Sequence, residues 1–168
     1  MRRWLLANVL GWTVGLYLGL LNPVCFAGAG IIAGLTLGAA QLWALHPGGT
    51  SDRRWLGLTF AGAALGLIPA SLIGGLAALL GGWNAAALVA GAILGGAVGA
   101  AQSRLIDSPP EGRLWWITAN LIGGGICGFL TALPIIRGLP IGLLVGSALF
   151  GYLTGRLWLR WFPESEEP

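Results

Sequence analysis

The chain has 168 residues, of which 56% are apolar and only 9% are charged, with nine arginines, no lysine and a net charge of +3. A soluble domain carries roughly 25% charged residues, and a soluble fold of this length has too small an interior to bury so much apolar surface. The composition therefore predicts an all-α integral membrane protein, in which the positive charge concerns topology rather than nucleic-acid binding. The 30 glycines agree with this class, because small residues let helices pack closely within a bilayer.

Six apolar runs follow one another along the chain, each close to the roughly 20 residues that cross a bilayer. The breaks between them hold proline, glycine and asparagine, which favour turns. The predicted spans are Trp4–Leu21, Phe26–Leu45, Trp55–Leu80, Ala85–Ile106, Leu114–Ile136 and Leu139–Trp158. We predict a bundle of six transmembrane helices in one domain (residues 1–160), followed by an acidic cytoplasmic tail (161–168).

The charged residues sort to one side of this six-span arrangement. Eight arginines and every acidic residue fall on that side, and Arg137 alone falls on the other. By the positive-inside rule both termini face the cytoplasm, and an odd number of spans would destroy the asymmetry. A competing interpretation treats residues 1–29 as a signal peptide. We disfavour it because the pattern within this segment recurs deep in the chain, where no signal can lie.

The odd-numbered spans begin with one pattern and the even-numbered spans end with another. The odd spans begin with Trp-x3-Asn/Thr-x2-Gly, at Trp4, Asn8 and Gly11, at Trp55, Thr59 and Gly62, and at Trp116, Asn120 and Gly123. Two even spans end with Gly-x3-Gly-x3-Gly-x2-Gln, at Gly30 to Gln41 and Gly91 to Gln102, and the sixth has the looser Ser147, Gly151 and Thr154. These patterns predict three helical hairpin repeats (about 2–47, 53–107 and 112–160) around a pseudo-threefold axis along the membrane normal.

Helical spacing turns the pattern into a candidate interior polar cluster. Residues at offsets 0, 4 and 7 share one helix face, and small residues mark the faces where membrane helices touch. The polar side chains on those faces should therefore point into the bundle, at similar depth near the cytoplasmic side: Asn8, Gln41, Thr59, Gln102, Asn120 and Thr154. In one interpretation they only lock the helices together by hydrogen bonds. In the other they line a polar vestibule that holds a ligand.

Other landmarks carry weaker signals. Pro69 lies in the middle of the longest apolar run, where it predicts a kink and a possible hinge. His46 begins a loop without a second ligand nearby, and Cys25 and Cys127 fit neither a metal pattern nor a disulfide framework, so no metal site is predicted. Most tryptophans are expected in an aromatic belt at the membrane interfaces, with Trp12 deeper.

The predicted spans lack the residues that coupled transport or catalysis needs. No Asp, Glu, Lys or His lies in the middle of any of them, so an ion-coupled carrier has no charged element. No nucleophile stands near a base, and the glycine ladders lack the lysine of a phosphate loop. We therefore expect a protein that is not an enzyme.

The combination W-x2-A-N-x2-G and G-x3-G-x2-Q resembles a set of uncharacterised polytopic bacterial membrane proteins, many from photosynthetic species, built from glycine-rich hairpins. The likeness is strongest at residues 4–45 and 91–123 and weaker at 139–158, where threonine replaces glutamine. The resemblance implies a shared architecture, no established activity, and a location in the bacterial cytoplasmic membrane or, in a phototroph, the thylakoid membrane. In size and span count alone, the chain also looks like the substrate-binding subunit of energy-coupling-factor vitamin importers.

We accordingly expect an accessory or assembly subunit of a larger membrane complex. The alternative is a small-molecule transporter or substrate-binding membrane subunit whose site is the interior polar cluster. The expected partners are the lipid bilayer and other membrane subunits, with no nucleic acid. No cofactor is predicted, and a bound lipid, quinone or pigment is compatible with either interpretation.

Overall fold

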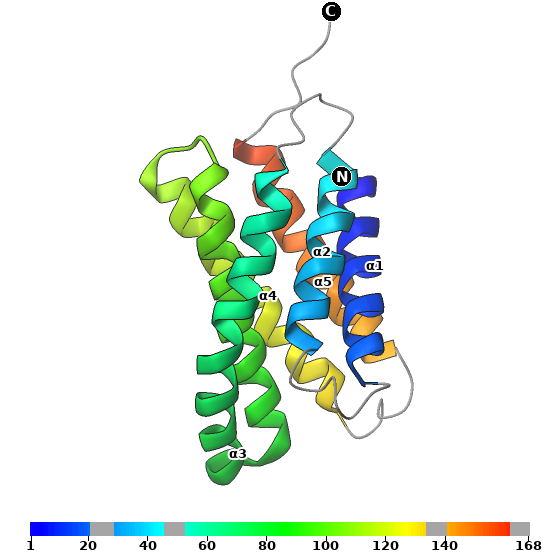
Figure 1. The fold of residues 1–168 in the computed structure, drawn as a ribbon, viewed down its shortest axis with the longest axis vertical. Coiled ribbons are helices and arrows are strands. Elements are labelled where there is room, and N and C mark those ends of the chain that lie inside the picture. The colour runs from blue at the N-terminus through cyan, green and yellow to red at the C-terminus, as the bar shows by residue number, and fades with distance from the viewer. Residues whose placement is uncertain (21–28, 46–52, 134–140, 162–168) are drawn as a thin grey trace, which may run out of the picture.

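The computed structural model describes residues 1–20, 29–45, 53–133 and 141–161. These residues are almost entirely helical (Figure 1). They form α1 (Arg2–Leu20), α2 (Ala29–Leu45), α3 (Arg54–Gln102), a 3-10 turn η3 (Ser103–Leu105), α4 (Pro110–Ala132) and α5 (Ile141–Trp161). The fold is therefore all-α, as the composition predicted.

The long helix α3 consists of two arms that meet at Gly82. Inside α3 this residue alone has non-helical backbone dihedrals, with φ 76° and ψ −173°, a conformation that is essentially restricted to glycine. The chain reverses there, so the two arms lie side by side (Figure 1). The turn lies where the sequence predicted one, between residues 80 and 85.

The prediction of six membrane-spanning helices is corrected by the structure. The described residues form five helices, of which three are long and apolar enough to cross a membrane: Arg54–Leu105, Pro110–Ala132 and Ile141–Arg160. The predicted spans 55–80 and 85–106 are counted as one because they correspond to the two arms of a single element, α3. The apolar part of α2, Ile31–Leu45, is shorter, and α1 begins with two arginines. The three long helices indicate a membrane protein.

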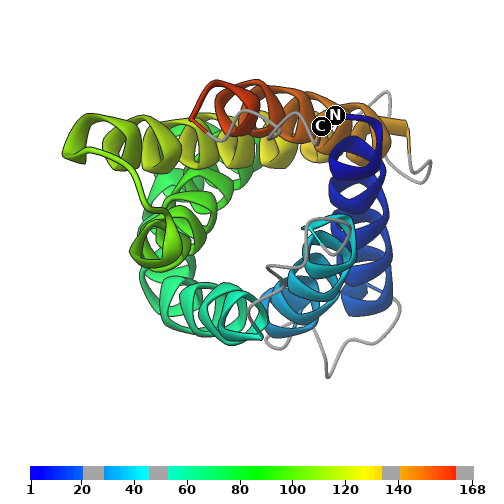
Figure 2. The ribbon, with the colours of Figure 1, turned by 90° about the horizontal axis from the view of Figure 1, so that it is seen from above.

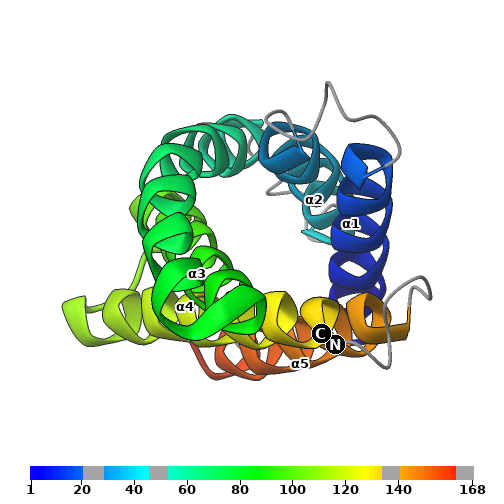
Figure 3. The same cartoon turned by 90° about the horizontal axis from the view of Figure 1, so that it is seen from below.

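The helices close into a ring. Contacts join α1 to α2, α2 to α3, α3 to α4, α4 to α5, and α5 back to α1. Viewed from above and from below, the helices surround a common centre (Figures 2 and 3). The start of α1, the end of α2, both ends of α3, the start of α4 and the end of α5 lie at the same end of the molecule (Figure 1). Side chains from every helix can therefore meet near that end.

The same end carries the arginines. Those within the described residues lie in or beside these helix ends: Arg2, Arg3, Arg53, Arg54, Arg104, Arg113, Arg156 and Arg160. We call this the arginine end. Arg137, the one arginine predicted on the opposite side, lies outside the described residues, as do Cys25, His46 and the acidic tail from residue 162.

Large apolar side chains cover the outer surface of the ring. Leu65, Leu79 and Leu80 of α3 are 73%, 83% and 87% exposed. So much exposed apolar surface is unusual for a monomer in water and matches a surface that faces lipid. The polar side chains must then be sought inside.

Candidate functional site

The six polar residues of the predicted cluster all lie in the interior. Their side chains come from α1, α2, both arms of α3, α4 and α5, and each is 0% exposed: Asn8, Gln41, Thr59, Gln102, Asn120 and Thr154. None of them faces the outer surface, where an unpaired amide in hydrocarbon would be costly. We refer to these residues below as the interior polar cluster.

Gln41 is the most connected member of the cluster. Its Nε2 donates to Asn8 Oδ1 at 2.9 Å, and its Oε1 accepts from Trp55 Nε1 at 3.0 Å and from Gln102 Nε2 at 2.8 Å. Gln102 Nε2 also donates to Thr59 Oγ1 at 2.8 Å. A continuous chain of side-chain hydrogen bonds thus joins α1, α2 and both arms of α3.

The three polar residues near the helix starts are each anchored to the tryptophan one turn before them. Asn8 Nδ2 donates to the Trp4 carbonyl at 2.8 Å, and Asn120 Nδ2 donates to the Trp116 carbonyl at 2.9 Å. The Thr59 hydroxyl donates to the Trp55 carbonyl at 2.8 Å. These bonds to the preceding turn use a donor on each side chain and leave an oxygen free to accept from a neighbouring helix.

Thr154 connects α5 to α1 in place of a glutamine. Its hydroxyl donates to the Phe150 carbonyl at 2.9 Å and accepts from Trp4 Nε1 at 3.0 Å. The hydroxyl has one proton, so it has no second donor for Asn120. The structure therefore places Asn120 among the buried residues of the cluster without joining its oxygen to the rest.

Five buried polar atoms have no hydrogen-bond partner among the residues that the structure describes. Three belong to one sector of the ring, where α3 meets α4: Gln102 Oε1, Asn120 Oδ1 and Trp116 Nε1. Asn120 contacts Gly99, one turn before Gln102, and follows Trp116 by one turn. The other two, Trp12 Nε1 and Thr13 Oγ1, lie further along α1. Buried polar groups are nearly always paired, so the first three mark a place where the hydrogen-bond network is incomplete.

Four tryptophans form a compact group at the arginine end, next to the polar cluster. The ring centroids of Trp4, Trp55 and Trp116 lie 6.2, 5.9 and 6.1 Å apart, and Trp158 lies 5.5 to 5.8 Å from each of them. Such separations are typical of favourable aromatic pairs. We call these four residues the tryptophan quartet.

The quartet corrects the prediction of an interfacial belt for these residues. Trp4, Trp55 and Trp116 are at most 5% exposed, because each stands four residues before a polar-cluster residue and therefore lies on the same inward helix face. Trp43, Trp83 and Trp115 are exposed on the outside. Trp12 is buried in edge-to-face contact with Phe150, at a centroid distance of 5.6 Å.

Glycines lie where polar side chains of a neighbouring helix pass. A Cβ added to Gly38 would lie 3.1 Å from the Cβ of Thr59. The same contact recurs at 2.7 Å between Gly99 and Asn120 and at 2.9 Å between Gly151 and Asn8. In each case the glycine precedes Gln41, Gln102 or Thr154 by three residues. The glycine ladder therefore makes room for the side chains of the cluster.

A second set of glycine contacts recurs between α1 and α2, between the two arms of α3, and between α4 and α5. A Cβ added to Gly11 would lie 2.6 Å from the Leu37 Cα, and one added to Gly62 would lie 2.8 Å from the Val98 Cα. The third pair is Gly123 with Phe150, at 3.3 Å from its Cα. Each glycine follows a tryptophan of the quartet by seven residues.

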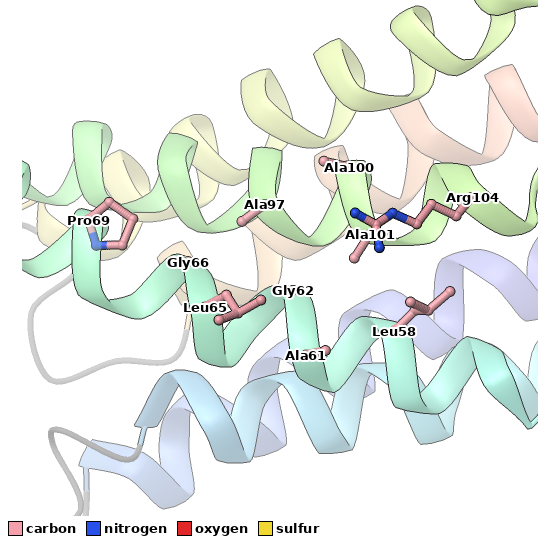
Figure 4. A pocket seen from close by; sticks show the side chains of 10 residues that line it. All are labelled: Leu58, Ala61, Gly62, Leu65, Gly66, Pro69, Ala97, Ala100, Ala101 and Arg104. Carbon is pink, nitrogen blue, oxygen red and sulfur yellow. The ribbon is translucent and has the colours of Figure 1, made fainter.

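Pro69 lies away from the cluster, on the outer face of α3. The helical dihedrals of α3 continue through Pro69, and the reversal of α3 occurs at Gly82. It lines an open groove of about 260 Å³ between the two arms, whose opposite ends are marked by Pro69 and Arg104 (Figure 4). A comparable groove of about 340 Å³ between α4 and α5 contains Tyr152 and Arg156.

The described residues hold no group of three or more His, Cys, Asp or Glu side chains that could bind a metal ion. Cys127 is buried, with its sulfur 4.0 Å from the Ser147 hydroxyl oxygen. The pair was not predicted from the sequence, although Ser147 appeared in the pattern of the sixth span. In the part of the chain that the structure describes, most of the buried polar side chains therefore belong to the interior polar cluster.

Comparisons with known proteins add no relative. No family model, no curated protein and no solved structure matches this chain.

Proposed function

We propose that this chain is a non-enzymatic integral membrane protein that serves as an accessory or assembly subunit of a larger membrane complex. In this proposal the bundle consists of three hairpins related by a pseudo-threefold axis: α1 with α2, the two arms of α3, and α4 with α5. The interior polar cluster holds the hairpins together, and the outer surface contacts lipid and other subunits. The membrane is the bacterial cytoplasmic membrane or, in a phototroph, the thylakoid membrane.

The pseudo-threefold arrangement is supported by contacts that recur at matching positions. Trp4, Trp55 and Trp116 stand at the corners of a nearly equilateral triangle with sides of 5.9 to 6.2 Å. Trp158 is almost equidistant from the three, as a residue close to the axis must be. Both sets of glycine contacts recur once in each hairpin or hairpin pair.

A structural role for the cluster is supported by how its atoms are used. Gln41 makes three side-chain hydrogen bonds to groups on other helices, and none of the six residues is exposed. The tryptophan quartet fills the arginine end of the axis beside them. A ligand site needs free polar groups that converge on an open pocket, whereas these groups mainly satisfy one another.

An accessory role places the interactions on the outside of the ring. The outer surface is apolar, and two grooves on it are lined in part by Arg104 and by Arg156, which belong to the arginine end. Lipid chains or helices of another subunit fill such grooves, while the guanidinium groups reach the headgroups. By the positive-inside rule the arginine end faces the cytoplasm.

A second candidate function, a small-molecule transporter or substrate-binding membrane subunit, is favoured by one observation. Gln102 Oε1, Asn120 Oδ1 and Trp116 Nε1 are buried without partners among the described residues, and they would offer a small polar ligand two acceptors and one donor. The candidate ranks second because the quartet closes the axis next to them.

Native mass spectrometry on the tagged chain, extracted from its source membrane in mild detergent, separates the two functions. The accessory role predicts partner chains in fixed stoichiometry with the tagged chain. A chain that emerges alone, with a bound organic molecule that is lost in Asn120→Leu, would establish the transporter role instead. Phe129→Leu, at an exposed apolar position of the same helix, is the matched control and should change neither result.

A further inference from the structure

The incomplete sector of the hydrogen-bond network contains a defined set of unpaired donors and acceptors. Gln102 is 0% exposed, Asn120 is 0% and Trp116 is 3%. Their atoms without partners among the described residues are two acceptors, Gln102 Oε1 and Asn120 Oδ1, and one donor, Trp116 Nε1. Buried polar groups are nearly always paired, so three unpaired atoms in one sector need a physical explanation.

The corresponding sector one hairpin earlier shows what is missing. There, the Gln102 amide nitrogen donates to Gln41 Oε1 and to Thr59 Oγ1, both at 2.8 Å. Under the pseudo-threefold relation, the residue that matches Gln102 in the third hairpin is Thr154. A glutamine at 154 would donate to the residues that match Gln41 and Thr59, which are Gln102 and Asn120.

The two unpaired acceptors are therefore the two that an amide nitrogen at position 154 would satisfy. Thr154 cannot do so, because its only proton goes to the Phe150 carbonyl at 2.9 Å. The unpaired donor follows the same relation. Trp55 Nε1 donates to Gln41 Oε1 at 3.0 Å, and the matching donor to Gln102 Oε1 is Trp116 Nε1.

We infer that a single buried water molecule is bound in this sector, where it accepts from Trp116 Nε1 and donates to Gln102 Oε1 and Asn120 Oδ1. Water is the ligand whose capacity fits this set, since buried waters typically make about three hydrogen bonds to groups that would otherwise be unsatisfied. An ammonium ion cannot accept from the indole. The inference rests on the pseudo-threefold arrangement of the proposed function and treats the missing glutamine side chain as replaced by water.

The difference in size between threonine and glutamine at position 154 agrees with a small ligand. Threonine lacks the terminal carboxamide of glutamine, so the space in question is that of one amide group. Gly99 lets the Asn120 side chain approach closely, with a distance of 3.1 Å between an added glycine Cβ and the Asn120 Cγ. The site therefore suits a ligand no larger than the three heavy atoms of a carboxamide rather than an organic substrate.

The test detects the water directly. In protein that is uniformly labelled with ¹⁵N in detergent micelles, the indole N–H of Trp116 should show a cross-relaxation signal to a long-lived water. The indole N–H groups of Trp4 and Trp55 are internal controls and should show none, because both donate to side chains at 3.0 Å. The three signals are assigned with Trp→Phe variants.

Thr154→Gln should replace the water by the amide that the other two hairpins use. The Trp116 water signal should disappear, and the melting temperature should rise by about 2–4 °C, the shift that about 1 kcal/mol gives in a chain of this length. Thr154→Val, which has the same shape but no hydroxyl, should keep the water signal and lose the Trp4 hydrogen bond.

A wild-type protein without a water signal at Trp116 would overturn the inference, whether or not Thr154→Gln folds. A co-purified organic molecule that contacts Trp116 would overturn it as well. The result is independent of the accessory role, because the absence of partner chains in native mass spectrometry would leave the water signal unchanged.

Discussion

Replacement of Gln41 by leucine is the sharpest test of the interior polar cluster. Leucine keeps most of the volume and is well suited to a helix, so the change removes hydrogen bonds rather than packing. It deletes the bonds to Asn8 Oδ1, Trp55 Nε1 and Gln102 Nε2. Of these three partners, Gln102 alone keeps another side-chain bond from the same atom, to Thr59.

The expected loss follows from the number of bonds. Side-chain hydrogen bonds between membrane helices contribute about 0.6 kcal/mol on average and up to about 1.7 kcal/mol. Three of them give about 2–5 kcal/mol, which corresponds to a decrease in melting temperature of about 4–20 °C. Gln102→Leu removes two bonds and should cost less, about 1–3 kcal/mol. The double variant should cost about 1 kcal/mol less than the two single losses together, because the variants share one bond.

Unfolding in mixed micelles with rising denaturing detergent, followed by tryptophan fluorescence, measures these losses. Ala39→Leu is the matched control: it adds a leucine to α2 at an exposed position and should leave the midpoint unchanged. A Gln41→Leu protein that unfolds at the same midpoint as Ala39→Leu and the wild type would refute a structural role for the cluster. If that protein had also lost a bound small molecule, the transporter function would take its place.

Two further predictions concern glycines and are measured by the same unfolding assay. Gly95→Ala should destabilise the bundle by about 1–3 kcal/mol, because its added Cβ would meet the Asn120 carbonyl and lie 3.1 Å from the Gly124 Cα, whereas Gly75→Ala meets nothing within 4 Å and should be neutral or stabilising. Equal midpoints for these two variants would contradict the close packing of α3 on α4. Gly82→Ala should cost about 1–3 kcal/mol through its backbone alone, since φ is 76° and no atom lies within 4 Å of an added Cβ. Gly57→Ala, equally uncrowded but within regular helix, is its control. An equal effect of both variants would contradict the positive φ of Gly82 at the turn between the two arms of α3.

Spacing in the sequence was enough to predict the members of the polar cluster. The pairs Trp4–Asn8, Trp55–Thr59 and Trp116–Asn120 stand one helical turn apart and therefore share a face. The same spacing contained the signal for the tryptophan quartet, which was overlooked because tryptophan is usually interfacial in membrane proteins. Trp158 follows Thr154 by the same four residues, so its place in the quartet could also have been inferred.

The number of spans could not be obtained from apolar runs alone. The turn at Gly82 was visible as a glycine pair, yet helical structure continues on both sides of it, so α3 forms one element of 49 residues. The helix α2 has 17 described residues, Ala29–Leu45, and the first residues of its predicted span lie outside the described part of the chain.

The unpaired atoms were beyond the sequence as well. In the sequence, threonine at position 154 in place of glutamine only made the pattern of the sixth predicted span weaker than that of the other even spans. Only the positions of Gln102 Oε1, Asn120 Oδ1 and Trp116 Nε1 show that this change leaves two acceptors and a donor without partners among the described residues.

The most direct test of the central claim uses the fact that Gln41 and Gln102 are the only glutamines in the sequence. Protein made by cell-free synthesis with ¹³C at glutamine Cδ alone, reconstituted in lipid bilayers, contains one isolated pair of labelled carbons. Solid-state NMR measures the distance between them. Two carboxamides joined by the hydrogen bond of 2.8 Å between Gln102 Nε2 and Gln41 Oε1 should give a carbon–carbon distance of about 4–5 Å. The absence of a dipolar coupling between the two carbons would show that the amides do not meet inside the bundle, and would contradict the account.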